Sequence, residues 1–97
     1  MKLKFEWGEN KNAFNIKKHG VSFEEAKMVF YDPESVEVYD NEHSLTEDRW
    51  KIIGLSGCFL LKIICTEKNG LIRIISARKA DKKDEEVYFY GYSKAGS

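Results

Sequence analysis

The side chains best suited to chemistry in this sequence are cations that recur through its second half. Arginine offers a planar, permanently charged fork that matches phosphate oxygens, and lysine offers a compact positive charge. Cations with apolar residues between them are typical of surfaces that bind a polyanion backbone such as RNA, although a solvated sheet face has the same composition. The residues concerned are Arg49, Lys51, Lys62, Arg73, Arg78 and Lys79.

Three other side chains are candidates for proton transfer or substrate positioning. His19 can accept and donate a proton near neutral pH, but a histidine at the end of a helix also serves as a cap there. Tyr88 belongs to an aromatic cluster that could stack on unpaired bases or dock a helix on a sheet. Ser76 begins the run Ser76-Ala77-Arg78-Lys79 at the end of a predicted strand.

The remaining reactive residues indicate neither a metal site nor a cofactor site. His19 and His43 are far apart, and the carboxylates show no metal-ligand spacing. The chain has no glycine-rich phosphate loop. Cys58 and Cys65 lie in the apolar run CFLLKIIC, on opposite faces of one predicted strand, which favours two buried thiols in a reducing compartment over a disulfide.

The totals of the chain are typical of a small domain with balanced charge. Its 97 residues fit a single domain over 1–97, with a tail that we expect to fray from residue 93. Sixteen basic residues balance sixteen acidic ones, so binding to a polyanion must depend on local clustering. The start MKLKFEWGEN lacks the apolar segment of a signal peptide, and no apolar run reaches the length of about 20 that spans a bilayer. We therefore expect a cytoplasmic protein without a membrane partner.

The first third of the chain predicts one strand and two helices. The strand is expected over residues 2–7 and the first helix over residues 10–19, which ends where Gly20 can adopt the left-handed conformation. Ser22 and Glu25 form a capping box for the second helix. Apolar residues recur at helical spacing in both: Ala13, Phe14 and Ile16, then Phe23, Ala26, Val29 and Phe30.

In the rest of the chain, apolar residues alternate with polar ones, which is the pattern of β-strands. Tight turns at Ser56-Gly57 and Asn69-Gly70 indicate two hairpins. The predicted strands cover residues 36–39, 49–55, 58–66 and 71–79, and a final helix covers residues 81–92. These elements predict an α+β fold, in which a small antiparallel sheet carries two N-terminal helices and a C-terminal helix.

The two turns set a register that sorts the side chains by face. The apolar face, which should pack on the helices, comprises Trp50, Ile52, Phe59, Leu61, Ile63, Cys65, Ile72 and Ile74. The other face carries Arg49, Lys51, Lys62, Arg73 and Lys79. Lys51 and Lys62 become direct cross-strand neighbours, which is unfavourable unless an anion lies between them.

Arg78 conflicts with this register. In a regular strand it would point into the apolar layer, opposite to Arg73, and a buried guanidinium is costly. A twist or bulge near Ser76 and Ala77 would redirect it and could bring both arginines to one phosphate. The alternative is an arginine that pairs with an acid at the start of the last helix, such as Asp81 or Asp84.

Several short motifs follow one another in a specific order. They are FEW at 5–7, KHGVSFEEA at 18–26, DP at 32–33, EDRW at 47–50, IG at 53–54 and RIISARKA at 73–80, followed by Tyr88. This set closely resembles the BrnT family, the toxins of bacterial type II toxin–antitoxin pairs, over about residues 3–88. One departure is that the family usually continues with threonine and then Glu-Arg, where this chain has Asp81 and then Asp84-Glu85.

The resemblance implies a fold, an activity and partners. The fold would be like that of the RelE-type ribonucleases, and the activity would be a metal-independent endoribonuclease that lowers translation. The partner would be a BrnA-like antitoxin with a ribbon-helix-helix part, through which the complex contacts operator DNA. The residues that match the family's motif positions are His19, Arg49, Arg73, Ser76, Arg78, Lys79 and Tyr88.

These residues suggest how RNA could be cleaved through its own 2′-hydroxyl. Arg73 and Arg78 would bind the scissile phosphate, and His19 or Tyr88 would transfer protons. Arg49 would complete the catalytic set near that phosphate, and Lys79 and Ser76 would position the neighbouring backbone. Lys51 and Lys62 would also bind RNA. One alternative is a non-catalytic module that binds RNA or the antitoxin, and another is a structural domain whose cations pair internally.

Overall fold

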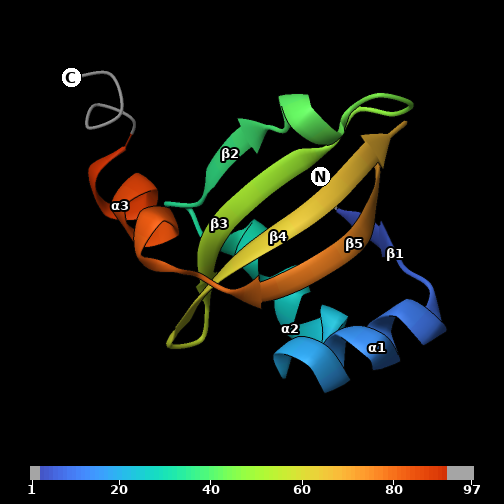
Figure 1. The fold of residues 1–97 in the computed structure, drawn as a ribbon, viewed down its shortest axis with the longest axis horizontal. Helices are drawn as coiled ribbons and strands as arrows, with labels where there is room; N and C mark the ends of the chain where they lie inside the picture. Colours follow the sequence, from blue (N-terminus) through green and yellow to red (C-terminus); the bar gives the residue numbers. More distant parts are fainter. Residues whose placement is uncertain (1–2, 92–97) are drawn as a thin grey trace.

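The computed structural model describes residues 3–91, except for the side chain of His43. The elements, in chain order, are β1 (Lys4–Glu6), α1 (Glu9–His19), α2 (Phe23–Lys27), the 3-10 helix η1 (Met28–Tyr31), β2 (Val36–Tyr39), the 3-10 helix η2 (Asn41–His43), β3 (Trp50–Ser56), β4 (Phe59–Lys68), β5 (Leu71–Lys79) and α3 (Lys82–Tyr90) (Figure 1). The predicted tail from residue 93 and the last residue of the predicted final helix lie outside the described residues.

The described strands form one sheet in the order β1-β5-β4-β3-β2. The predicted α+β fold with three α-helices is therefore confirmed, but the prediction of a purely antiparallel sheet is wrong. β1 runs parallel to β5 and pairs Lys4 with Leu71 and Glu6 with Arg73. No tight turn joins these two strands, so the sequence carried no local signal for their pairing.

The helix ends follow local sequence signals closely. Ser22 accepts a hydrogen bond from the Glu25 amide at 3.0 Å, and the Glu25 carboxylate accepts from the Ser22 amide at 2.9 Å. This capping box is the predicted one, and it starts α2. Gly20 ends α1 with φ of 72°, in the left-handed region that glycine adopts without strain. Asp81 and Asp84 form a second capping box at the start of α3.

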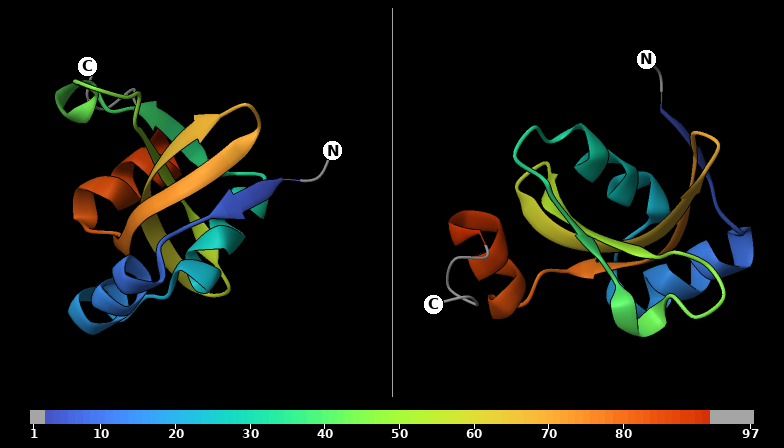
Figure 2. Two further views of the ribbon diagram at one scale, coloured as in Figure 1. Left: turned by 90° about the vertical axis from the view of Figure 1, so that its right-hand side faces the viewer. Right: turned by 90° about the horizontal axis from the view of Figure 1, so that it is seen from above.

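The core lies between α2, η1 and one face of the curved sheet. Its most completely buried large side chains are Phe23, Val29, Ile63 and Ile74, and each contributes about 1.5–3 kcal/mol when buried. Figure 2 shows α2 and η1 against this face, and the loop after β2 on the other face. The predicted apolar face of the sheet is confirmed for most of its members, but Phe59 is exposed.

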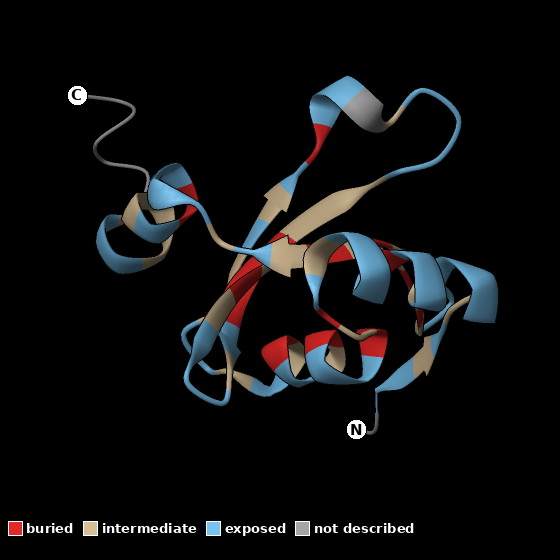
Figure 3. Ribbon diagram, turned by 60° about the horizontal axis from the view of Figure 1, so that its bottom comes forward, coloured by how far each residue is buried: buried red, intermediate tan, exposed pale blue. Residues whose placement is uncertain are grey.

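α1 does not bury the apolar residues that its sequence pattern favoured. Phe14 and Ile16 are exposed, and the buried residue of this helix is Asn15. Figure 3 shows the same contrast: buried positions concentrate on α2, η1 and the central strands, whereas α1 and α3 are largely exposed. α1 packs beside β5 at the edge of the sheet, where a polar side chain can satisfy backbone groups.

The first hairpin has a different turn from the predicted one. Ser56 pairs with Phe59, so the turn residues are Gly57 and Cys58 rather than Ser56 and Gly57. Gly57 has φ of 61°. Because the register moves by two residues, every side chain keeps its predicted face, but the cross-strand partners change: Lys51 pairs with Ile64, and Lys62 pairs with Ile53. The predicted direct contact between Lys51 and Lys62 is therefore wrong, as is the predicted burial of Cys58.

A β-bulge in β5 resolves the conflict over Arg78. Cys65 pairs with Ile74 and Ile64 with Ser76, so Ile75 is an extra residue without a cross-strand partner. Alternation is reversed after it: Ala77 joins the core, and Arg78 pairs with Lys62 on the outer face. The bulge also turns Lys79 to the core side of the sheet, opposite Leu61, which contradicts its predicted place beside Arg73.

Among the described helices, none combines the length and the apolar composition that a membrane span requires.

Candidate functional site

A cleft of about 530 Å³ lies on the outer face of the sheet, between the end of α1 and the loop after β2. We call it the cationic cleft. It is lined by His19, Asp40, Glu42, Arg49, Lys51, Lys62, Ile64, Ile75, Ser76, Ala77 and Arg78. It brings together six residues that the sequence analysis singled out, from four separate segments. The lysines and arginines exceed the carboxylates by two, so a chain without net charge has concentrated positive charge at one place.

Arg78 is held at the edge of the cleft by the start of α3. Its Nη2 lies 3.3 Å from Oδ2 of Asp81 and 3.4 Å from Oδ2 of Asp84, and its Nη1 donates to the Lys79 carbonyl oxygen at 3.0 Å. The capping box of α3 fixes both carboxylates, since Asp81 and Asp84 accept from each other's amides. The alternative pairing considered from the sequence is therefore present. The two carboxylates occupy the positions where phosphate oxygens would bind this guanidinium.

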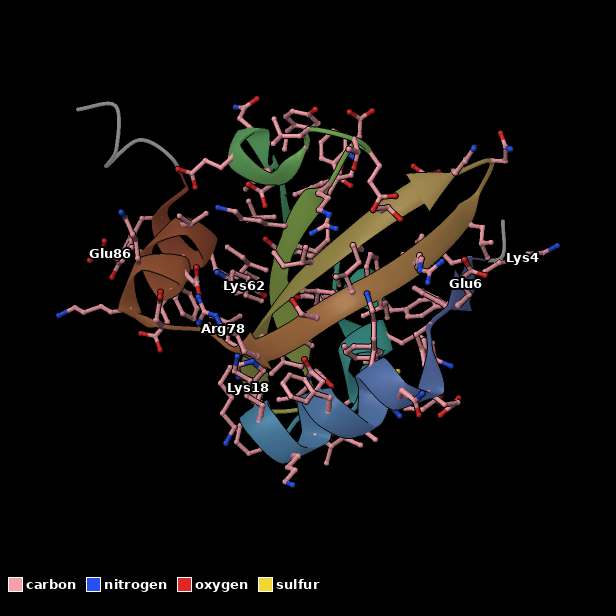
Figure 4. The ribbon with its side chains drawn as sticks, turned by 45° about the vertical axis from the view of Figure 1, so that its right-hand side comes forward. Lys4, Glu6, Lys18, Lys62, Arg78 and Glu86 are labelled. Carbon is pink, nitrogen blue, oxygen red and sulfur yellow. The ribbon has the colours of Figure 1, made fainter. Side chains whose placement is uncertain are left out.

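Lys62 lies beside Arg78 on β4 (Figure 4). Partial burial lowers the pKa of its ammonium group, and the positive charges of Arg78 and Lys51 lower it further, against an opposing effect of Asp84. Within the part of the chain that the structure describes, no carboxylate lies at ion-pair distance from Lys62. A half-buried cation under these conditions favours an incoming anion, because that anion restores interactions lost with water.

Arg49 approaches the cleft from the loop that precedes β3. Its backbone is fixed at both ends: its amide donates to Oγ of Ser44 at 2.9 Å, and its carbonyl accepts from the Asp40 amide at 2.9 Å. Its Nη2 lies 3.5 Å from Oε2 of Glu47. Its Nε is buried and has no hydrogen-bond partner among the described residues.

Asn15 is a residue that the sequence analysis missed. It is 4% exposed, and its Nδ2 donates to the carbonyl oxygens of Ala77 at 2.7 Å and Val21 at 2.8 Å, while its Oδ1 accepts from the Ala77 amide at 3.1 Å. These bonds replace the strand pairing that β5 loses beyond the end of β1. Asn15 thereby holds the bulged segment that presents Ser76 and Arg78 to the cleft. The sequence did contain one indirect signal for this role. In a regular strand Arg78 would point into the apolar layer, so the strand had to be irregular there and leave backbone groups that need other partners.

Arg73 lies outside the cationic cleft. It is 3.8 Å from Oε2 of Glu6 and lines a depression of about 930 Å³ at the other end of β5. Arg73 and Arg78 are five positions apart in the sequence, which corresponds to about 16 Å along a strand. The expected sharing of one phosphate by these two arginines does not fit this separation.

Lys79 and Tyr88 also lie away from the cleft. Nζ of Lys79 stands 4.8 Å from the centroid of the Phe59 ring, a cation–π contact on the opposite side of the sheet. The Tyr88 hydroxyl donates to Oδ2 of Asp32 at 2.6 Å. This hydrogen bond, together with burial, raises the pKa of Tyr88 to about 12, which makes the phenol a weaker acid. The first contact joins β5 to β4, and the second joins α3 to the segment that follows η1.

The described residues include no group of three or more histidine, cysteine, aspartate or glutamate side chains placed to hold a metal ion. What the cleft offers is therefore charge, hydrogen-bond donors and one imidazole. This combination can bind a phosphodiester, stabilise additional negative charge on it and exchange protons with it.

Comparison with protein families identifies a match over most of the chain. A model of the family described as the ribonuclease toxin BrnT of type II toxin–antitoxin systems matches residues 7–84. This range contains every residue that lines the cationic cleft, and it ends at Asp84, before most of α3. Comparison with curated protein sequences gives no match.

Proposed function

This chain belongs to the BrnT family of ribonuclease toxins of type II toxin–antitoxin systems, and we propose that it cleaves RNA in the cationic cleft without a metal ion. The observation that carries the assignment is the convergence of Arg49, Lys51, Lys62 and Arg78 with His19 in one cleft. Phosphodiester cleavage needs cations where negative charge develops and a group that can exchange a proton beside them. The cleft supplies both from the protein's own side chains.

The proposed reaction is an in-line transfer within the RNA strand. The 2′-oxygen attacks the adjacent phosphorus, its proton passes to a base, and a bond forms between the 2′-oxygen and phosphorus. The bond between phosphorus and the 5′-oxygen of the next nucleotide breaks, and that oxygen receives a proton. The products are a 2′,3′-cyclic phosphate and a free 5′-hydroxyl. No oxidant, reductant or added nucleophile is required.

In this proposal, Lys62 and Arg78 bind the non-bridging oxygens of the scissile phosphate. They are cross-strand partners, so their charges act on one small volume. Arg78 would exchange its contacts with Asp81 and Asp84 for contacts with phosphate. A bound phosphate opposes the effects that lower the pKa of Lys62, and its attraction to this ammonium group strengthens as negative charge increases in the transition state.

His19 is the proposed proton carrier. It lines the cleft at the end of α1, and an imidazole can act as base toward the 2′-hydroxyl and as acid toward the leaving oxygen. Ser76 would orient the strand, and Arg49 and Lys51 would contact neighbouring phosphates. The proposal gives Tyr88 a docking role, because its hydroxyl is bound to Asp32.

The test is incubation of purified protein with a single-stranded RNA in EDTA, with analysis of the fragment ends. We expect cleavage by the wild type that leaves cyclic phosphate ends, and a loss of at least about 100-fold in rate for Arg78→Ala, within the range that one electrostatic contact contributes. Arg73→Ala is the matched control, since it removes an arginine from the same strand outside the cleft. Its rate should stay within a few-fold of wild type.

Two results would contradict the proposal. Cleavage that Arg73→Ala abolishes and Arg78→Ala spares would move the site to the other end of β5. Retention of intact RNA by the wild type, with salt-dependent affinity and no fragments, would favour the alternative of a non-catalytic binding module. Circular dichroism and thermal melting of each variant separate these outcomes from misfolding.

The family also implies an antitoxin partner. We propose that this partner is BrnA-like, that it carries a ribbon-helix-helix part, and that the toxin reaches operator DNA only through it. Co-expression with the neighbouring reading frame should restore growth and yield a co-purifying complex. Growth arrest that persists with a co-expressed, soluble partner would contradict this pairing.

A further inference from the structure

A second concavity adjoins the cationic cleft along α1. It encloses about 460 Å³, and it shares His19, Ile75 and Ser76 with the cleft. We call it the α1 hollow. Its other lining residues all come from α1: Asn10, Lys11, Phe14, Asn15 and Lys18. A ligand that fills the cleft can therefore continue into the hollow across Ser76 and His19 without leaving the protein surface.

The residues of the α1 hollow combine an aromatic ring with flanking cations. Phe14 is 64% exposed, although phenylalanine is usually inside a protein. Nζ of Lys18 stands 5.8 Å from the centroid of its ring, and Lys11 lies on the same face of the helix one turn earlier. No carboxylate lines this concavity. An exposed ring between two lysines matches the chemistry of a nucleotide, which has a flat base and an anionic backbone.

The charges around the cleft distinguish the two directions in which a bound strand could continue. Toward Arg73, the depression at the other end of β5 has three cations and four carboxylates: Lys4, Lys68 and Arg73 against Glu6, Glu47, Asp48 and Glu67. Toward α1, the hollow has two lysines and no acid. Figure 4 shows these directions: Lys18 lies at the Arg78 end of β5, whereas Lys4 and Glu6 lie at the opposite end. A phosphate backbone is therefore attracted toward the α1 hollow and repelled from the depression at the Arg73 end of β5.

We propose that the α1 hollow is a nucleobase subsite of the toxin. The RNA strand that places its scissile phosphate between Lys62 and Arg78 turns over Ser76 and His19, and the base of a neighbouring nucleotide stacks on Phe14. Lys11 and Lys18 contact the phosphates on either side of that base. Because every base has a flat face, this contact selects unpaired strands rather than a particular sequence. The inference rests on the proposed function of the cleft.

The test measures binding without cleavage. The probe is a fluorescein-labelled hexamer of 2′-O-methyl adenosine, in which the attacking hydroxyl is blocked, and the readout is fluorescence anisotropy at fixed salt. Loss of one base stack corresponds to a rise in Kd of about 5- to 150-fold for Phe14→Ala. Phe14→Trp should retain wild-type affinity. The matched control is Phe89→Ala on α3, because Phe89 is also 64% exposed but lies beside Glu85 and Glu86.

A second comparison ties the effect to a base. Hexamers with a single abasic site are scanned, and at one position the Kd difference between wild type and Phe14→Ala should disappear. An effect of Phe14→Ala that persists at every abasic position would overturn the stacking assignment.

The outcomes separate this inference from the proposed function. Lys62→Ala acts on the cleft alone. If Lys62→Ala weakens binding and Phe14→Ala does not, the cleft stands and the subsite is wrong. If neither variant changes the Kd, the cleft assignment fails as well. If Phe14→Ala weakens the complex with the antitoxin and leaves the RNA Kd unchanged, the hollow is a protein-binding surface and the subsite is again wrong.

Discussion

Replacement of Asn15 by leucine should expose how much of the cleft depends on one buried amide. Leucine has nearly the same shape but cannot form hydrogen bonds, so the Ala77 amide, the Ala77 carbonyl and the Val21 carbonyl all lose a partner. Each buried group left unpaired costs about 1–3 kcal/mol. With the lower value for each of the three groups, Asn15→Leu should lower the free energy of unfolding by about 3 kcal/mol.

A second asparagine on the same helix provides a control for this loss of stability. The Asn12 side chain accepts a single hydrogen bond, from the Phe23 amide at 2.8 Å, so Asn12→Leu should cost about 1 kcal/mol. For a domain of this size, these losses correspond to decreases in Tm of about 12–24 °C for Asn15→Leu and about 4–8 °C for Asn12→Leu. Thermal and urea denaturation give both values, and hydrogen exchange should show lost protection at the Ala77 amide.

The reasoning is refuted if Asn15→Leu destabilises the protein no more than Asn12→Leu does. That result would mean that β5 is held by its pairing with β4 alone, and that the bulge persists without the amide. Unchanged protection of the Ala77 amide in a folded Asn15→Leu protein would lead to the same conclusion.

Two further predictions concern titrating groups beside the cleft and α3. Burial lowers the pKa of Lys62, so its charged form destabilises the fold below that pKa, and the penalty disappears as pH rises toward the ordinary value of 10.5. Lys62→Met should raise Tm at pH 7 while it reduces RNA cleavage, and a lower Tm would contradict this sign. The pKa of Tyr88 is raised to about 12, so its bond to Asp32 stabilises the protein below pH 10 and is lost as pH rises through 12. Tyr88→Phe should cost about 1.5 kcal/mol at pH 7 and leave cleavage unchanged; a large loss of cleavage in a folded Tyr88→Phe protein would place the hydroxyl in the reaction.

Local signals in the sequence predicted local structure well. The capping box at Ser22 and the hairpin at Asn69-Gly70 depend on residues a few positions apart, and both are present. The turn at Gly57 was misplaced because two registers that differ by two residues put the same side chains in the core. The hydrophobic pattern cannot distinguish them. The parallel pairing of β1 depends on residues distant in the sequence and had no signal of this kind.

The candidate site was predicted in its composition but not in its geometry. Residue types alone predicted that Arg49, Lys62 and Arg78 could bind a polyanion, and the fold brings these three residues together in one cleft. Regular alternation, however, placed Arg73 with Lys79 and left Arg78 unexplained. One extra residue, Ile75, reverses that arrangement, and its stability depends on an amide 60 residues earlier in the chain. A contact between residues so far apart in the sequence cannot be predicted from the local hydrophobic periodicity.

If the cleft binds RNA as proposed, the acids around it give a chain of zero net charge a means of selecting its ligand. Asp81 and Asp84 already occupy the guanidinium of Arg78, so an RNA phosphate must displace carboxylates rather than water. This exchange reduces the gain from any single phosphate and disfavours weak, nonspecific binding. A strand that also fills the α1 hollow gains a stacked base and two lysines that no carboxylate opposes within that concavity. Affinity then depends on a ligand that reaches both places, which only an unpaired, flexible strand can do.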